Sequence, residues 1–210
     1  ARPGFRPLTE EEKQAVRRQY AGGREYFFYL GSVNPRKNIQ RLIGAFDAFK
    51  DQSGAPVKLL IGGRFGWLTG AVRRAYEAAR HRADIVFLGY LPEEALPRLL
   101  GAATALAYVS LFEGFGLPIL EAFQAETPVI TSDAASMPEV AGAAAVLIDP
   151  LDTDNIAEAL RLVYRDAALQ QRLVEAGRRQ REQFSWEKTT GIVERELLKA
   201  AADSQKKLSW

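Results

Sequence analysis

Two glutamates and a glycine-rich turn form the most informative stretch of the sequence. Glu113 and Glu121 are separated by seven residues, and Gly114, Gly116 and Pro118 lie between them. The glycines allow the backbone to approach a ligand closely, and Pro118 suits the first turn of a helix. A helix start of this kind attracts phosphate through unpaired amides and the positive end of the helix dipole. Because carboxylates accept hydrogen bonds from hydroxyls, we expect a diphosphate flanked by two hydroxyl-bearing groups.

The same stretch has a simpler interpretation. Glu113 would cap the following helix, and Glu121 would lie on the solvent-facing side of that helix, with no ligand involved. The isolated pattern Glu-Gly-x-Gly does not decide between the two interpretations, so the rest of the chain has to.

Other catalytic chemistries lack the residues that they need. The chain has no cysteine and one histidine, His81, which leaves no Cys-His nucleophile and at most one imidazole for a metal. Some enzymes hold a divalent metal with an Asp-x-Asp pair, and Asp152-Thr153-Asp154 has this form. It opens a predicted helix, however, so we interpret it as an N-cap. The run Gly62-Gly63-Arg64-Phe65-Gly66 lacks the Gly-x-Gly-x-x-Gly fingerprint of dinucleotide binding.

Composition limits the class of protein. With 210 residues, 47% of them hydrophobic, the chain suits one large domain with a substantial core. A net charge of +2 gives no support for a nucleic-acid binder. We find no apolar run that could span a bilayer and no signal peptide, and the absence of cysteine is compatible with a reducing cytoplasm. The opening run Ala1 to Phe5 resembles a linker, so we expect one domain of a longer protein.

Short apolar segments alternate with helical patterns along the chain. Predicted strands are Tyr26–Leu30, Val57–Ile61, Ile85–Leu88, Ala105–Val109, Val129–Thr131 and Ala145–Ile148. Helices are predicted from about residue 10, after Asn38 as N-cap, around 68–82, 93–101, 117–126 and 137–141, and almost throughout 153–202. This alternation predicts an α/β fold: a Rossmann-like, doubly wound parallel sheet of about six strands with helices on both faces. Ligands bind such sheets beyond the carboxyl ends of the strands.

Several further motifs give the chain a family resemblance. Glu-Gly-Phe-Gly-Leu-Pro-x-x-Glu stands in full from Glu113 to Glu121, and Gly31-Ser32-Val33-Asn34-Pro35-Arg36-Lys37-Asn38 follows the first predicted strand. Val86 to Leu91, Pro128 to Ser132 and Met137 to Val140 match as well. Together these segments resemble the donor-binding C-terminal domain of the retaining, family-4 type (group 1) glycosyltransferases of the GT-B fold. The likeness covers roughly residues 25 to 200.

The resemblance implies roles for individual residues. Glu113 would lie beside the donor sugar, Glu121 would hold the ribose hydroxyls, and Lys37 would neutralise the departing diphosphate. Glu113 and Lys37 are therefore the expected catalytic residues. The expected donor-binding set is Gly31, Ser32, Arg36, Lys37, Gly62, Tyr90, Leu91, Glu113, Gly114, Phe115, Gly116, Leu117 and Glu121. Within it the amides of Gly116 and Leu117 would cradle the distal phosphate, and Tyr90 and Leu91 would contact the base.

One position departs from the family pattern. Many members have an arginine five residues before the lysine, and here that position is Ser32. Arg36 offers a replacement charge, although neighbouring residues in a loop usually point apart. A surface or interdomain contact is the alternative for Arg36.

The resemblance implies a hexosyltransferase that takes a nucleoside-diphosphate sugar (GDP-, UDP-, ADP- or dTDP-linked), needs no metal or other cofactor, and lacks its N-terminal acceptor domain here. Expected boundaries are 1–24 for a linker and leading helix, 25–203 for the donor domain and 204–210 for a tail. The family builds surface polysaccharides and lipid-linked glycans, which implies a cytoplasmic location, with peripheral contact of the full enzyme at the inner membrane face left open. A non-catalytic nucleotide-sugar-binding module, a sugar-nucleotide epimerase and a phosphorylase remain alternatives.

Overall fold

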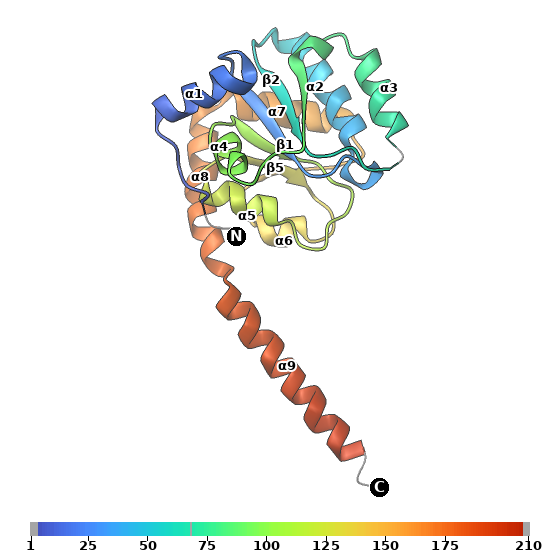
Figure 1. Cartoon of the computed structure of the whole chain (residues 1–210), viewed down its shortest axis with the longest axis vertical. Coiled ribbons are helices and arrows are strands. Elements are labelled where there is room, and N and C mark those ends of the chain that lie inside the picture. The colour runs from blue at the N-terminus through green and yellow to red at the C-terminus, as the bar shows by residue number, and fades with distance from the viewer. Residues whose placement is uncertain (1–3, 68, 208–210) are drawn as a thin grey trace.

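A parallel sheet at the centre of the molecule brings the predicted loops to one edge (Figure 1). The computed structural model describes residues 4–67 and 69–207, with side chains as far as residue 200. Within this range six parallel strands run in the order β3-β2-β1-β4-β5-β6. They are β1 (Tyr26–Leu30), β2 (Lys58–Gly62), β3 (Ile85–Gly89), β4 (Ala105–Tyr108), β5 (Val129–Ser132) and β6 (Val146–Ile148). The predicted doubly wound sheet is confirmed.

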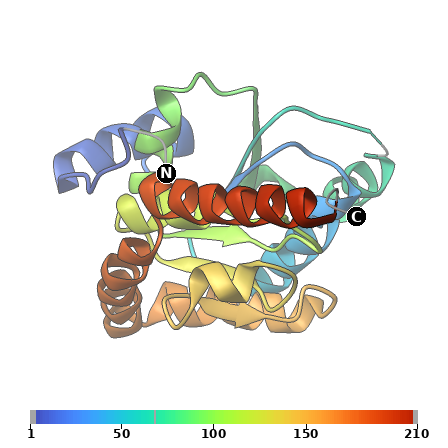
Figure 2. The same cartoon turned by 90° about the horizontal axis from the view of Figure 1, so that it is seen from below.

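Helices cover both faces of the sheet. The helices are α1 (Glu10–Ala21), α2 (Ile39–Ser53), α3 (Gly70–Ala78), α4 (Ala95–Gly101), α5 (Leu117–Gln124), α6 (Met137–Ala141), α7 (Thr153–Arg165), α8 (Ala167–Gln180) and α9 (Trp186–Lys207). Right-handed crossovers place α2 and α3 on one face and α4 and α5 on the other, because the chain reverses its direction across the sheet after β3. Helix α7 returns to pack against α2, and Figure 2 shows α7 and α1 on opposite sides of the sheet.

Strand β1, in the middle of the sheet, shows why the strands are continuous apolar runs in the sequence. Four successive side chains of β1, from Tyr26 to Tyr29, are fully buried. Alternate residues face opposite layers, so both layers must be apolar for a strand in the middle of a parallel sheet. Phe27 packs edge-on against Phe49 of α2, with ring centroids 5.7 Å apart. Tyr26 donates its hydroxyl to the carbonyl of Leu99 at 2.7 Å, which satisfies a buried polar group at the end of α4.

The leading helix belongs to the same core as the sheet. Thr9 and Glu12 form the predicted capping box, in which the Thr9 side chain accepts from the amide of Glu12 and the Glu12 side chain accepts from the amide of Thr9. Val16 and Ala21 are fully buried. Residues 1–3 of the expected linker lie outside the described residues.

Element boundaries differ from the predicted ones by small amounts in the strands and more in the helices. β2 is shifted by one residue relative to the predicted Val57–Ile61, and α3 is shorter than the predicted 68–82. The long helical region after residue 153 divides into α7, α8, a 3-10 turn (Arg181–Gln183) and α9. Helix α9 continues to Lys207, past the expected start of a tail at residue 204, and 208–210 lie outside the described residues.

Asn38 has the predicted position at the start of α2 but a different role. Its backbone is left-handed (φ 61°), and its side chain does not cap the helix. Instead Nδ2 donates to the carbonyl oxygens of Val109 at 3.1 Å and Pro150 at 2.7 Å. The fully buried Asn38 therefore ties the loop after β1 to the end of β4 and to the loop before α7. The expectation of side-chain capping was wrong: Oδ1, the atom that would accept the capping bond, instead accepts from Arg41 Nη1 at 3.0 Å and Gln40 Nε2 at 3.4 Å.

The last helix projects away from the body of the molecule (Figure 1). Several of its apolar side chains are exposed, among them Trp186, Val193 and Leu197. In the described part of the chain no helix combines the length and the apolar character needed to cross a membrane.

The role of Asn38 can be tested by two substitutions. Asn38→Gly tolerates the left-handed backbone but loses both hydrogen bonds, and should lower the free energy of unfolding by about 1–3 kcal/mol. Asn38→Ala adds the strain of a left-handed alanine, roughly a further 1 kcal/mol. Urea unfolding of both variants measures the two effects. Equal losses would show that the backbone conformation carries no cost, and a negligible loss in Asn38→Gly would show that the two hydrogen bonds do not stabilise the fold.

Candidate functional site

The site lies where the strand order reverses. β1 and β4 are neighbours in the sheet, but their following loops lead to helices on opposite faces, which opens a crevice at their carboxyl ends. Two loops meet there: 31–38 after β1 and 109–116 after β4. The amide of Leu111 donates to the carbonyl of Arg36 at 2.8 Å and, together with the bond from Asn38 to Val109, fixes the loops to one another.

Three charged side chains converge in this crevice. The Lys37 ammonium contacts Oε1 of Glu113, and Arg36 Nη1 donates to Oε2 of the same carboxylate at 2.6 Å. Arg36 also donates to the carbonyl of Phe112 at 2.5 Å. The 3-10 turn of Pro35–Lys37 explains how two adjacent residues reach one group. Arg36 and Lys37 were expected to point apart, and here they do not.

Tyr108, which the sequence analysis did not single out, completes the cluster. Lys37 Nζ donates to the Tyr108 hydroxyl at 3.3 Å and lies 5.2 Å from the centre of its ring. Lys37 and Glu113 are 7% and 8% exposed, so the pair is largely withdrawn from water. Tyr108 is the last residue of β4. Because the predicted strand is apolar, the sequence did not indicate a polar role for this tyrosine.

Burial and pairing act against one another on the charges of the cluster. Burial lowers the pKa of Lys37, and the hydrogen bond and charge of Glu113 raise it only in part. Burial raises the pKa of Glu113, but hydrogen bonds from its neighbours, the largest from Lys37, outweigh it, so that the pKa lies below its usual range. Near neutral pH the carboxylate is ionised. The two cations exceed it by one charge, which favours an anion in the crevice.

The glycine turn leads from Glu113 into α5. Gly116 has φ 102°, a left-handed conformation that glycine adopts without strain, and Pro118 stands in the first turn of the helix as predicted. The Ser136 hydroxyl, from the loop after β5, lies 2.9 Å from the carbonyl oxygens of both Glu113 and Phe115. Phe115 packs edge-on against Phe184, 5.7 Å between ring centroids. Ser136 and Phe184 therefore hold the turn from two sides, and the start of α5 lies at the crevice.

The second glutamate of the motif has a different environment. Glu121 lies one turn into α5 and is 1% exposed. The four residues around it, Ile119, Leu120, Ala122 and Phe123, are buried as well. The interpretation of Glu121 as a surface residue is therefore wrong. Its predicted contact with ribose stays a prediction.

The remaining predicted residues line a second part of the same sheet edge. Gly31 donates to the carbonyl of Gly62 at 2.9 Å, and Gly63 donates to that of Gly89 at 2.8 Å. A Cβ on Gly63 would lie 1.9 Å from the carbonyl oxygen of Gly31, so only glycine allows these loops to approach so closely. A cavity of about 520 Å³ opens beside them, and its lining includes Ser32, Tyr90 and Leu91. Ser32 accepts a hydrogen bond from Asn34 at 3.0 Å.

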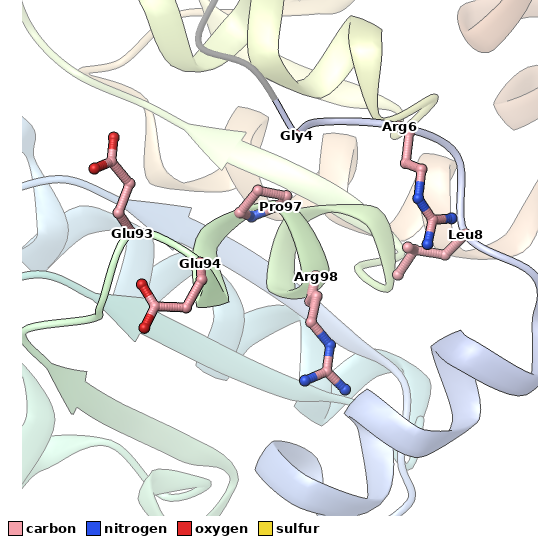
Figure 3. A pocket seen from close by; sticks show the side chains of 7 residues that line it. All are labelled: Gly4, Arg6, Leu8, Glu93, Glu94, Pro97 and Arg98. Atoms are coloured by element: carbon pink, nitrogen blue, oxygen red, sulfur yellow. The ribbon is translucent and has the colours of Figure 1, made fainter.

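Another cavity, of about 570 Å³, lies apart from these residues. Figure 3 shows it between the amino-terminal segment, with Arg6 and Leu8, and the start of α4, with Glu94, Pro97 and Arg98. Acidic and basic side chains are mixed around it, and Arg6 is paired with Glu12. None of the predicted site residues lines this cavity.

The Asp-x-Asp tripeptide caps a helix, as predicted. Asp152 Oδ1 accepts from the amides of Asp154 at 2.9 Å and Asn155 at 3.0 Å at the start of α7. His81, which was expected on an exposed surface, is half-buried, with Nε2 3.0 Å from Asp51. Neither residue belongs to the crevice.

Comparison with known proteins fits this arrangement. Residues 10–180 match the sequence model of the family "Glycosyl transferases group 1". The chain belongs to this family. It is 37% identical over 165 residues to the O-antigen chain mannosyltransferase B of Escherichia coli, covering 79% of this chain and 43% of that protein. It is also 28% identical over 187 residues to the serotype-specific mannosyltransferase WbdA of E. coli, covering 88% of this chain and 23% of that protein.

Solved structures agree on the fold of this glycosyltransferase group 1 chain. The C-terminal domain of the group 1 family protein LpcC from Francisella tularensis has a TM-score of 0.73 at 21% identity, covering 84% of this chain and 93% of that one. Anabaena HepE, solved with UDP and glucose, has a TM-score of 0.78 at 19% identity, covering 94% and 55%. The present chain thus spans less than half of the curated relatives and about half of HepE, and it has the fold of one half of a GT-B enzyme.

The charge coupling between Glu113 and Lys37 predicts a pH effect. Glu113 raises the pKa of Lys37, so Glu113→Gln should let the ammonium lose its proton at lower pH. Pyrophosphate binding, followed by calorimetry from about pH 7 to about pH 10, should then weaken at lower pH in the variant than in the wild type.

Glu126→Gln is the matched control, because Glu126 pairs with Arg178 on another surface. It should leave the profile unchanged. If Glu113→Gln leaves it unchanged too, Lys37 is not the group that binds the anion.

Proposed function

We propose that this chain is the donor-binding domain of a retaining, metal-independent mannosyltransferase. It would bind a nucleoside-diphosphate sugar, and the hexosyl unit would pass to an acceptor held by another part of a longer protein. One observation carries the proposal: Lys37 and Arg36 from the β1 loop meet Glu113 at the start of the turn that leads into α5. The mannosyl assignment is supported by the names of the relatives, which include the O-antigen chain mannosyltransferase B.

The reaction needs positive charge at one point. The bond between the anomeric carbon and the diphosphate oxygen breaks, and its electron pair leaves with the diphosphate. The acceptor oxygen then bonds to the anomeric carbon on the same face, and its proton passes to the departing diphosphate or to water. Since negative charge grows on the leaving oxygen, fixed positive groups lower the barrier. Lys37, Arg36 and the amides before α5 are the groups that would supply this potential.

Glu113 would have a second role once the donor is bound. An ammonium group has three N–H donors, so Lys37 can contact Glu113 and a phosphate oxygen at the same time. The carboxylate would remain ionised beside the sugar and accept hydrogen bonds from its hydroxyls. Its fixed negative charge would also oppose the positive charge that develops at the anomeric carbon. This division assigns Lys37 to the leaving group and Glu113 to the sugar.

The biological setting follows from the relatives as a proposal. Several of them are O-antigen or serotype-specific mannosyltransferases, so we propose a step in the synthesis of a surface polysaccharide or lipid-linked glycan. Nucleotide sugars of this kind are used in the cytoplasm, which is where we place the protein. Any contact with a membrane would belong to the full-length enzyme.

Nucleotide binding is the direct test of the donor site. GDP, UDP, ADP and dTDP titrated into the chain by calorimetry should show binding by at least one nucleoside diphosphate, and no glycosyl transfer by this chain alone. Lys37→Ala should weaken this binding by about tenfold or more, because it removes a charge-assisted contact with the diphosphate. Lys58→Ala, at the amino-terminal start of β2, is the control. If none of the four nucleotides binds at millimolar concentration, the donor-site proposal fails.

Glu121 needs a test that separates ribose binding from a structural role. Glu121→Gln keeps the size of the side chain and should weaken GDP binding several-fold while leaving pyrophosphate binding unchanged, because only the nucleotide carries a ribose. Thermal unfolding of the same variant reports the structural contribution. A loss of thermal stability with unchanged GDP binding would remove Glu121 from the site.

A further inference from the structure

A polar cavity lies at the edge of the sheet opposite to the crevice. Its volume is about 290 Å³, and its lining includes Glu25, Thr104 and Pro128. These residues immediately precede β1, β4 and β5, so the cavity lies at the amino-terminal ends of three neighbouring strands. Helices α1 and α8 contribute further charged and amide side chains to the lining, and none of the predicted site residues belongs to it.

Arg17 of α1 brings unsatisfied hydrogen-bond donors to this cavity. Its side chain is only 12% exposed. Nε donates to the carbonyl of Ala102 at 3.4 Å, whereas Nη1 lies 3.6 Å from Glu10 and Nη2 lies 3.7 Å from Glu25. The last two distances are too long for hydrogen bonds. Within the described part of the chain, the N–H groups of both Nη atoms therefore lack an acceptor.

Two further polar groups of the lining are in the same position. Thr104 is 7% exposed, and its hydroxyl has no hydrogen-bond partner among the residues that the structure describes. The Glu25 carboxylate meets Arg17 through the long 3.7 Å contact. Polar groups that are withdrawn from water and left without partners destabilise a protein. The cavity is therefore suited to a polar molecule that supplies the missing partners.

The charges around the cavity balance. Three carboxylates and three cations meet here: Glu10, Glu25 and Glu126, and Lys13, Arg17 and Arg178. Arg178 and Glu126 satisfy one another through two hydrogen bonds, of 2.8 and 2.6 Å. An anion would meet repulsion as well as attraction in such surroundings. A neutral ligand that can both donate and accept hydrogen bonds suits the remaining groups better.

We propose that this cavity is a binding site for one neutral hexose unit, separate from the donor crevice. A hydroxyl both donates and accepts, so neighbouring hydroxyls of one sugar can accept from Arg17 and donate to Glu25. Small-molecule sites begin at about 300 Å³, so a cavity of this size suits a single unit. Leu8 and Val174 offer apolar contacts to the C–H groups of the ring. A sugar bound here leaves the crevice open, because it lies at the other end of the strands.

Nuclear magnetic resonance titration of the nitrogen-15-labelled chain with D-mannose and methyl α-D-mannopyranoside tests the proposal. D-Mannose should shift the amide resonances of Arg17, Glu25 and Thr104 with a Kd of about 1–10 mM, as expected for so small a ligand. The glycoside has a substituted anomeric oxygen, like a unit within a glycan chain. Binding of both sugars assigns the cavity to glycan units, and binding of D-mannose alone assigns it to the free sugar.

Two substitutions separate sugar binding from a structural role. Arg17→Lys keeps the charge but loses the paired Nη donors, and should weaken D-mannose binding about tenfold. Glu25→Gln changes a half-exposed side chain and should weaken binding about threefold or more. Glu77→Gln is the matched control, because Glu77 is similarly exposed and pairs with Arg73 on α3. It should change nothing. The amide spectrum of each variant reports whether it is folded, and Glu25→Gln decides alone if Arg17→Lys is not.

Three results would overturn the hexose site. The first is an absence of shifts at the cavity up to about 50 mM sugar, well above the expected Kd, or shifts confined to residues 114–117 at the crevice. The second is wild-type affinity in folded Arg17→Lys or in Glu25→Gln. The third is tighter binding of inorganic phosphate than of D-mannose at the same amides, since that is the behaviour of an anion site. Nucleotide binding at Lys37 is a separate measurement, so the donor-site proposal stands or falls independently.

Discussion

The contact of Glu113 with Lys37 and Arg36 is the interaction on which the crevice depends. A buried carboxylate is costly unless it is paired and hydrogen-bonded, and here both of its oxygens have a cationic donor. The donors come from the loop after β1 and the acceptor from the loop after β4. Because the strand order makes these strands neighbours, the pairing joins the two loops at the switch point. It also leaves one positive charge in excess, which is the condition for holding an anion.

The backbone around this contact is arranged before any ligand binds. Asn38 is left-handed so that its side chain can reach two buried carbonyls, and Gly63 lies against Gly31 at a distance that excludes any Cβ. Gly116 turns the chain into α5 through another positive φ. These residues contribute by fixing where the Lys37 and Glu113 side chains begin, so that little ordering is left for the moment of binding.

The sequence predicts the fold well because the relevant signals are local. Alternation of apolar strands with amphipathic helices leaves few arrangements besides a doubly wound sheet, and the predicted loops do meet at its carboxyl edge. Glu113, Glu121 and Lys37 could likewise be picked out as candidate site residues from their spacing in the sequence alone. What failed depends on contacts across the sheet. The convergence of Arg36 with Lys37 on Glu113 and the hydrogen bonds that Asn38 donates both link segments that are far apart in the sequence.

The two glutamates of the motif differ because the chain changes conformation between them. Glu113 precedes the left-handed Gly116 and belongs to a loop, so its carboxylate can extend into the crevice. Glu121 follows the start of α5, a helix buried almost all round because it packs between β4, β5, α4 and α8. A residue one turn into such a helix has no solvent face to occupy. Glu121 is therefore held within the helix packing, whereas Glu113 lies at the crevice with both of its carboxylate oxygens on cationic donors.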